Sequence, residues 1–170
     1  VRLAAAQAFW DTPDPGVRTM LEGLSRELEP QVEKLRISGG LTKPRSRGDE
    51  TTRYPDAWVR THRLLARFGE EESLRRLLDA YVQDFSTYPQ EQAPAVPMGR
   101  PTMSSTGPSL AGAIHAADAS PTHLLERLRK LVPDGTDWTS PPLTALRASL
   151  DPSSENSAEQ VPVKPPQPDI

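Results

Sequence analysis

The side chains best suited to acid–base or metal chemistry in this 170-residue chain are its three histidines, His62, His115 and His123. They lie far apart in the sequence, and none has a second histidine at the spacing that zinc-binding motifs use. His62 follows Arg60 on a helix face that we expect to be exposed, where a solvated histidine is more common than a catalytic base. We therefore predict no catalytic residue, no metal site and no cofactor, and we interpret the chain as non-enzymatic.

The composition also limits the classes of protein to which the chain can belong. It contains no cysteine, which excludes a thiol nucleophile, a disulfide framework and a cysteine-ligated zinc site. Its apolar run at residues 3–10 is interrupted by Gln7 and is too short to span a membrane. We expect a soluble, cytoplasmic protein that does not associate with membranes.

Three consecutive carboxylates, Glu70, Glu71 and Glu72, resemble a cluster for acid–base catalysis or for a divalent metal. They directly follow Gly69, however, and therefore fall in the first turn of an expected helix. Negative charge in the first turn is stabilised by the positive end of the helix dipole. We interpret the three glutamates as residues that stabilise the start of this helix.

Basic residues are concentrated before this point. Residues 41–68 contain seven basic and three acidic residues, a net charge of +4, whereas residues 69–86 contain two basic and five acidic residues, a net charge of −3. Opposite charges on consecutive helices usually pair within the chain. As an alternative, the basic segment 43–67 predicts a nucleic-acid-associated accessory protein, with Tyr54 and Trp58 as stacking groups. The candidate nucleic-acid-binding residues are Lys43, Arg45, Arg60, Arg63 and Arg67.

The elements that would position these side chains centre on residues 54–86, where two apolar patterns of helical period flank Gly69. The apolar residues are Trp58, Leu65 and Phe68 in the first segment, and Leu74, Leu77, Leu78, Tyr81, Val82 and Phe85 in the second. Glycine at this place is typical of a left-handed helix cap. The pattern predicts two antiparallel helices that form the core of the protein.

A third helical pattern precedes the hairpin. It begins at Thr12, which we expect to cap the helix, and continues to Ile37 before two glycines. Pro30 interrupts it, and a proline removes a backbone donor and clashes with the preceding turn. We predict either a kink or two helices that meet near Glu29, packed against the hairpin.

The second half of the chain is rich in proline. We predict a Pro-rich linker at 89–119, with one short helix at 110–117, because this stretch has little periodic apolar surface. Ser120 and Pro121 are typical of a helix start, and this helix should stop before Pro133. Ser140 and Pro141 begin a last helix that carries Leu143, Leu146 and Leu150.

These elements predict an all-α protein, a small helical body built on an αα-hairpin. We divide it into an N-terminal helical body at 1–88, the linker at 89–119, a short helical pair at 120–150 and a disordered Pro-rich tail at 151–170. No internal repeat and no run of alternating residues argues for a different architecture. Whether the helical pair docks on the N-terminal body is left open by the sequence.

We expect the protein to act as an interaction or assembly module that docks a partner helix or a second copy of itself. The candidate partner-binding residues form the apolar face of the helix after Ser120, and they are Leu124, Leu125, Leu128 and Leu131. Arg127, Arg129 and Lys130 flank this face and would orient the partner. Residues 162–168 contain two PxxP spacings, which also predict weak docking into a polyproline-binding groove.

Overall fold

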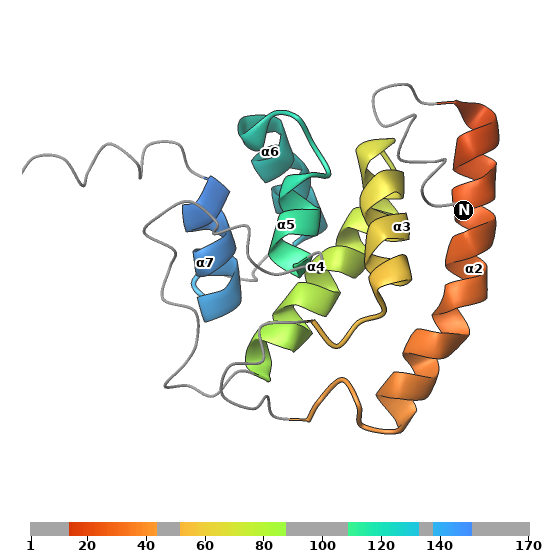
Figure 1. Ribbon diagram of the computed structural model, residues 1–170. Coiled ribbons are helices and arrows are strands. Elements are labelled where there is room, and N and C mark those ends of the chain that lie inside the picture. The colour runs from red at the N-terminus through yellow and green to blue at the C-terminus, as the bar shows by residue number, and fades with distance from the viewer. Residues whose placement is uncertain (1–13, 44–51, 88–108, 133–137, 151–170) are drawn as a thin grey trace, which may run out of the picture.

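The computed structural model describes residues 14–43, 52–87, 109–132 and 138–150. These residues contain helices and no strand, which confirms the all-α fold class (Figure 1). The helices of the described ranges are α2 (Pro15–Ile37), α3 (Asp56–Arg67), α4 (Glu71–Ser86), α5 (Leu110–His115), α6 (Pro121–Leu131) and α7 (Pro141–Leu150). None of these helices combines the length and the apolarity needed to cross a membrane.

Helices α3 and α4 form the predicted hairpin, and Gly69 makes the turn between them. Gly69 has a φ of 86°, which an L-residue with a side chain rarely adopts. The amide of Gly69 donates to the carbonyl of Ala66 at 3.1 Å, and the amide of Glu70 donates to the carbonyl of Leu65 at 3.0 Å. This pair of bonds is a Schellman motif. The predicted left-handed cap is therefore confirmed.

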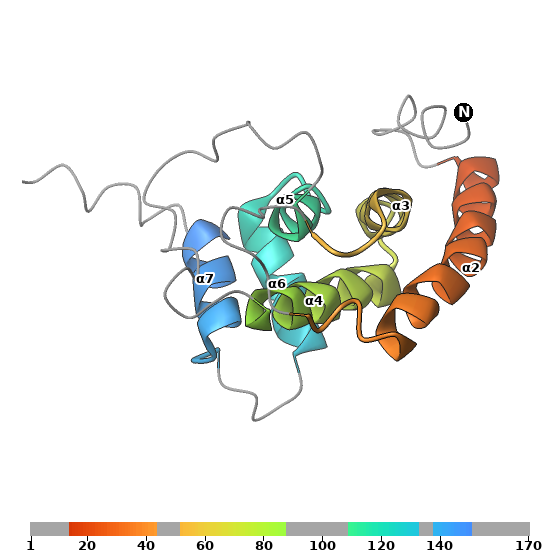
Figure 2. The same ribbon diagram turned by 60° about the horizontal axis from the view of Figure 1, so that its bottom comes forward.

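Helix α2 runs along the outside of the hairpin and continues through Pro30 as one helix. Figures 1 and 2 show that its axis bends along its length, as a proline inside a helix requires. The prediction of a kink is confirmed, and the alternative of two separate helices is wrong. The helix begins at Pro15, and its cap is the carboxylate of Asp14, which accepts from the amide of Gly16 at 2.7 Å. The predicted cap, Thr12, lies outside the described residues.

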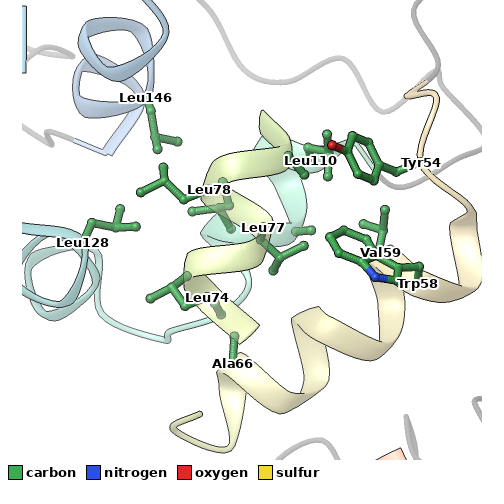
Figure 3. Close-up of a cluster of buried hydrophobic side chains, with 14 of the residues drawn as sticks. Tyr54, Trp58, Val59, Ala66, Leu74, Leu77, Leu78, Leu110, Leu128 and Leu146 are labelled. Atoms are coloured by element: carbon green, nitrogen blue, oxygen red, sulfur yellow. The ribbon is translucent and has the colours of Figure 1, made fainter. Parts of the chain in front are cut away.

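Helix α4 lies at the centre of the molecule and packs against α3, α5, α6 and α7. The main hydrophobic core takes side chains from all the described helices. Figure 3 shows Leu128 of α6 and Leu146 of α7 directed toward Leu78 on one side of α4. Trp58 and Val59 of α3 meet the other side of α4 near Leu77. The 120–150 helices thus share one core with the hairpin.

Helix α5 confirms the short helix predicted at 110–117, but its packing differs from that expected of the predicted linker at 89–119. Its residues Leu110, Ala113 and Ile114 are 3% exposed or less, and they belong to the main core. The hydroxyl of Ser109 starts the helix by accepting from the amide of Gly112 at 2.9 Å. Residues 109–119 are therefore part of the packed body. The rest of the predicted linker up to residue 108 lies outside the described residues, as does the predicted tail at 151–170.

Local signals in the sequence correctly predicted the ends of α6 and the start of α7. The Ser120 hydroxyl accepts from the amide of His123 at 3.3 Å, and Pro121 occupies the first helical position. Helix α6 ends at Leu131, before Pro133. Helix α7 begins at Pro141, as predicted, and buries its leucines in the core.

Candidate functional site

The leucines predicted to bind a partner divide into two pairs. Leu124 and Leu128 are fully buried in the main core, where α4 and α7 pack near them. Leu125 and Leu131 are only partly buried at the edge of that core. The predicted docking face of α6 is therefore wrong for Leu124 and Leu128, because the chain itself covers them. The sequence could not settle whether α6 packs on the hairpin, and that packing decides the outcome.

The residues predicted to bind nucleic acid are also only partly brought together. Arg60, Arg63 and Arg67 recur at three- and four-residue steps and so share one side of α3. Arg60 forms an ion pair with Asp56 at 2.8 Å. Burial, followed by the nearby charge of Arg60, lowers the pKa of Arg63. Lys43 is exposed in the segment after α2, and Arg45 lies outside the described residues.

A surface pocket of about 390 Å³ joins one residue from each of these two predicted sets. Arg67 enters it from the end of α3, and Leu131 enters it from the end of α6. We call it the Arg127 pocket, and its lining residues are Arg67, Gly69, Glu71, Asp118, His123, Arg127, Lys130 and Leu131. Neither predicted site alone identified this combination.

Arg127 is a fixed part of this pocket and is only 7% exposed. Its Nε donates to the carboxylate of Glu71 at 2.8 Å, and its Nη2 donates to the carbonyl of Ala66 at 2.9 Å. Its Nη1 donates to the carbonyl of Ala117 at 3.2 Å and to Asp118 at 3.3 Å. Arg127 therefore ties α6 to the ends of α3 and α4 and to the turn before α6. The prediction that it flanks an exposed docking face is wrong.

Asp118 is the second fixed charge of the pocket. Its carboxylate accepts from the amide of Ser120 at 3.0 Å and from Nδ1 of His123 at 2.6 Å, in addition to Arg127. Burial alone would raise the pKa of the Asp118 carboxyl, but these hydrogen bonds outweigh burial and hold the pKa below its usual value. Asp118 therefore stays ionised at neutral pH.

The pocket carries a small excess of positive charge. Three basic side chains, Arg67, Arg127 and Lys130, lie beside two carboxylates, Glu71 and Asp118, which leaves a formal net charge of +1. Both carboxylates are already bound by Arg127, whereas Lys130 is exposed at the pocket edge. The arrangement suits the binding of an anionic group.

A second polar cluster lies around His62, which the sequence placed on an exposed face. His62 is only 1% exposed, because α2 and α4 cover that side of α3. Its Nδ1 lies 3.0 Å from the hydroxyl of Ser73, and its Nε2 lies 3.4 Å from the hydroxyl of Ser25. Ser73 donates its own proton to Glu70. The Nδ1 of His62 must therefore be the donor to Ser73, which leaves Nε2 as an acceptor.

Glu29 completes the cluster from α2. It accepts from the indole nitrogen of Trp58 at 3.2 Å, forms an ion pair with Arg76, and lies 3.4 Å from Nε2 of His62. Burial lowers the pKa of His62 to about 4, although the charge of Glu29 acts in the opposite direction. His62 is therefore neutral at pH 7.

The order of serine, histidine and carboxylate in this cluster is similar to that of a hydrolytic triad. Ser73 is only 2% exposed, however, and its proton is directed to Glu70 instead of to His62. A substrate could not reach the Ser73 hydroxyl in this arrangement. The cluster instead joins α2, α3 and α4 through hydrogen bonds.

The glutamates after Gly69 are shared between these two clusters. Glu70 occupies the cap position of α4 but makes no side-chain hydrogen bond to the helix backbone, and accepts from Ser73 instead. Glu71 binds Arg127 of α6, and Glu72 pairs with Arg75 and Arg76. Their predicted place in the first turn is confirmed for Glu71 and Glu72. The ion pair of Glu71 with Arg127 had no signal in the sequence, whereas the pairs of Glu72 lie within α4 at three- and four-residue spacing.

Arg127 itself did have a signal that sequence reasoning missed. It stands three residues after Leu124 and directly before Leu128, so it belongs to the apolar side of the helix. A charged residue at such a position requires partners when the face is buried.

Within the ranges that the structure describes, no group of three or more histidine, aspartate or glutamate residues is placed to hold a metal ion. Comparison of the chain with known protein families, with curated proteins and with solved structures found no match.

Proposed function

We propose that this chain is a non-enzymatic helical module that binds a protein partner over the Arg127 pocket and the adjoining surface of α6. The observation that supports it best is the pocket itself, which places the partly buried Leu131 beside the cations Lys130 and Arg67. An apolar contact surrounded by charged groups is typical of a protein–protein interface. A fixed arginine beneath them keeps the surface in shape before the partner arrives.

The proposal limits the expected docking surface of α6 to the part of its apolar face that the chain itself does not cover. Leu125 and Leu131 remain partly exposed, whereas Leu124 and Leu128 serve the core. It gives no catalytic role to His62, whose hydrogen bonds all go to groups of this chain. The proposal retains the expected cytoplasmic location, which the lack of cysteine supports.

A nucleic-acid-associated accessory role is the second candidate. It is favoured by the shared side of α3 on which Arg60, Arg63 and Arg67 stand. It is weakened by Asp56, which pairs with Arg60, and by the carboxylates of the pocket next to Arg67. The proposed docking of residues 162–168 into a polyproline-binding groove stays a prediction, because these residues lie outside the described ones.

The experiment that tests the protein-binding role is selection of a displayed peptide library on the immobilised chain. We expect enrichment of peptides whose binding is lost with Leu131→Gln and retained with Ile37→Gln. Ile37 is 79% exposed at the end of α2, so it is a matched apolar control outside the pocket. Enrichment of no peptide that depends on Leu131 would contradict the proposal.

Light-scattering mass with a pool of DNA and RNA tests the second candidate. A gain in mass that falls as salt rises, and that is lost with Arg63→Glu, would favour nucleic-acid binding over protein binding. Lys34→Glu, at an exposed position on α2, serves as the charge-matched control.

A further inference from the structure

We infer that the Arg127 pocket accepts the carboxylate of a glutamate or aspartate side chain from an acidic segment of the protein partner. This inference rests on the proposed protein-binding function and specifies the chemistry of the partner. It assigns the polar part of the interface to the pocket and the apolar part to Leu131 at its edge.

The first support comes from the division of roles among the pocket cations. The guanidinium of Arg127 is occupied by Glu71, Asp118 and two backbone carbonyls. Its one positive charge offsets one of the two carboxylates, and its hydrogen bonds fix the walls. Lys130 is exposed at the pocket edge, so its ammonium group faces the space in which a ligand would lie. A carboxylate there gains charge-assisted hydrogen bonds.

The second support comes from the sign and size of the charge. A net charge of +1 is balanced by one carboxylate, while a phosphate dianion would bring excess negative charge close to Glu71 and Asp118. A nucleic-acid strand adds further phosphates on both sides of the first. The charge pattern therefore favours a single side-chain carboxylate over a polyphosphate chain.

The third support is the shape of the site. A volume of about 390 Å³ lies at the small end of ligand pockets and suits one side chain with its neighbours. The walls come from four segments, namely the end of α3, the start of α4, the turn before α6 and α6 itself. Arg127 bonds to each of the other three. The site is thus preorganised and need not rearrange when the anion enters.

The test is an NMR titration of the labelled chain with two short peptides, acetyl-Leu-Glu-Leu-amide and its neutral counterpart acetyl-Leu-Gln-Leu-amide. We expect the glutamate peptide to shift the amide resonances of Gly69, Glu71 and Lys130, and to bind about tenfold more tightly than the glutamine peptide. Lys130→Glu should abolish this difference in affinity. Arg147→Glu, at an exposed position on α7 outside the pocket, should retain it.

Each other outcome has a defined meaning. Equal binding of both peptides at the pocket would overturn the carboxylate inference and leave the protein-binding function in place. Failure of both peptides to move these resonances would count against the inference and the proposed function together. A shift produced by oligothymidylate but by neither peptide would overturn both in favour of nucleic-acid binding. The spectrum of Lys130→Glu without peptide controls for an intact fold, since residue 130 is exposed.

Discussion

His62 and Arg127 are two buried ionisable side chains that this molecule uses in different ways. His62 is 1% exposed and joins three helices through hydrogen bonds, and Arg127 is 7% exposed and joins four segments. His62 is enclosed between α2, α3 and α4, and burial keeps it neutral. Arg127 binds two carboxylates, and the groups around it open into a surface pocket.

The comparison shows that two buried hydrogen-bond networks of this chain differ in whether a surface pocket adjoins them. Around His62 the neighbouring groups are provided by the chain, and no lining residue of the Arg127 pocket belongs to that cluster. Around Arg127 the same kind of network leaves Lys130 and Leu131 at the surface. A network that holds segments together can therefore also form the wall of a surface pocket.

The largest expected effect on stability comes from replacing Arg127, the buried side chain that joins the walls of the Arg127 pocket. Arg127→Met removes the guanidinium that donates hydrogen bonds to the carbonyls of Ala66 and Ala117 and to the carboxylate of Asp118. We expect a loss of about 3 kcal/mol in the free energy of unfolding, because breaking a buried ion pair leaves an uncompensated charge. Urea denaturation measures it. Arg129→Met, at an exposed position of the same helix, should change the stability little. Equal effects of the two variants would show that Arg127 does not hold the segments together.

The contribution of the buried His62 cluster to the free energy of unfolding should depend on pH. Because the folded-state pKa of His62 is about 4 and the ordinary value is 6.5, the unfolded chain binds the proton more readily between these values. The contribution of neutral His62 is complete above pH 6.5 and is lost as the pH falls toward 4. This loss amounts to about 3 kcal/mol when the difference in pKa is converted to free energy. Urea denaturation over this pH range measures it.

A variant separates this effect from the titration of carboxylates. Asparagine can donate to Ser73 but does not titrate, so His62→Asn should have a shallower dependence of stability on pH. His123→Asn, at an exposed histidine outside the His62 cluster, removes the bond to Asp118 and is the matched substitution for comparison. If the free energy of unfolding falls equally in the wild-type chain and in His62→Asn from pH 6.5 to 4, His62 is not the cause of the pH dependence.

Much of the fold could be predicted because helix ends are decided by a few neighbouring residues. Gly69 marks the turn of the hairpin, and Ser120 with Pro121 marks the start of α6. The apolar period then identifies the helices themselves. The packing of α5 could not be predicted in this way, because a six-residue helix has almost no period and its burial depends on distant α3 and α4.

The site could be predicted only in part, for a related reason. Helical period identifies the side of a helix that packs against one neighbour. Helix α3 packs against both α2 and α4, so more of its surface is covered than the apolar period indicates. His62 is buried for this reason. Likewise, Leu131 and Arg67 were separately identified as candidates, but their meeting in one pocket depends on how α6 packs against the end of α3. Only Arg127, a charge on an apolar helix side, carried a signal of its own.

A smaller effect is expected at the cap of α6, which positions the pocket residues. Ser120→Ala removes the hydroxyl that accepts from the amide of His123 and leaves the backbone bond from Ser120 to Asp118 in place. We expect a loss of about 1 kcal/mol, which is typical of a helix cap. The midpoint of urea denaturation measures it. The corresponding change at the cap of the short helix α5, Ser109→Ala, removes a similar bond at a residue that does not line the pocket. If only Ser120→Ala also weakens binding of the glutamate peptide, the cap of α6 supports the pocket as well as the fold.

The smallest effect on stability is expected at the residue most important for the proposed binding. Lys130 is exposed, so Lys130→Glu should change the free energy of unfolding by no more than about 0.5 kcal/mol. The same variant should abolish the preference for the glutamate peptide, because it reverses a charge at the pocket edge. Denaturation and NMR titration of one sample measure both quantities. A large loss of stability would mean that Lys130, like His62, serves the fold, and the contrast between an open and a closed region would then be wrong. If Lys130→Glu is stable and loses only the preference for the glutamate peptide, binding and folding depend on different residues of one pocket. Arg127 would then stabilise the fold, and Lys130 would contact the partner.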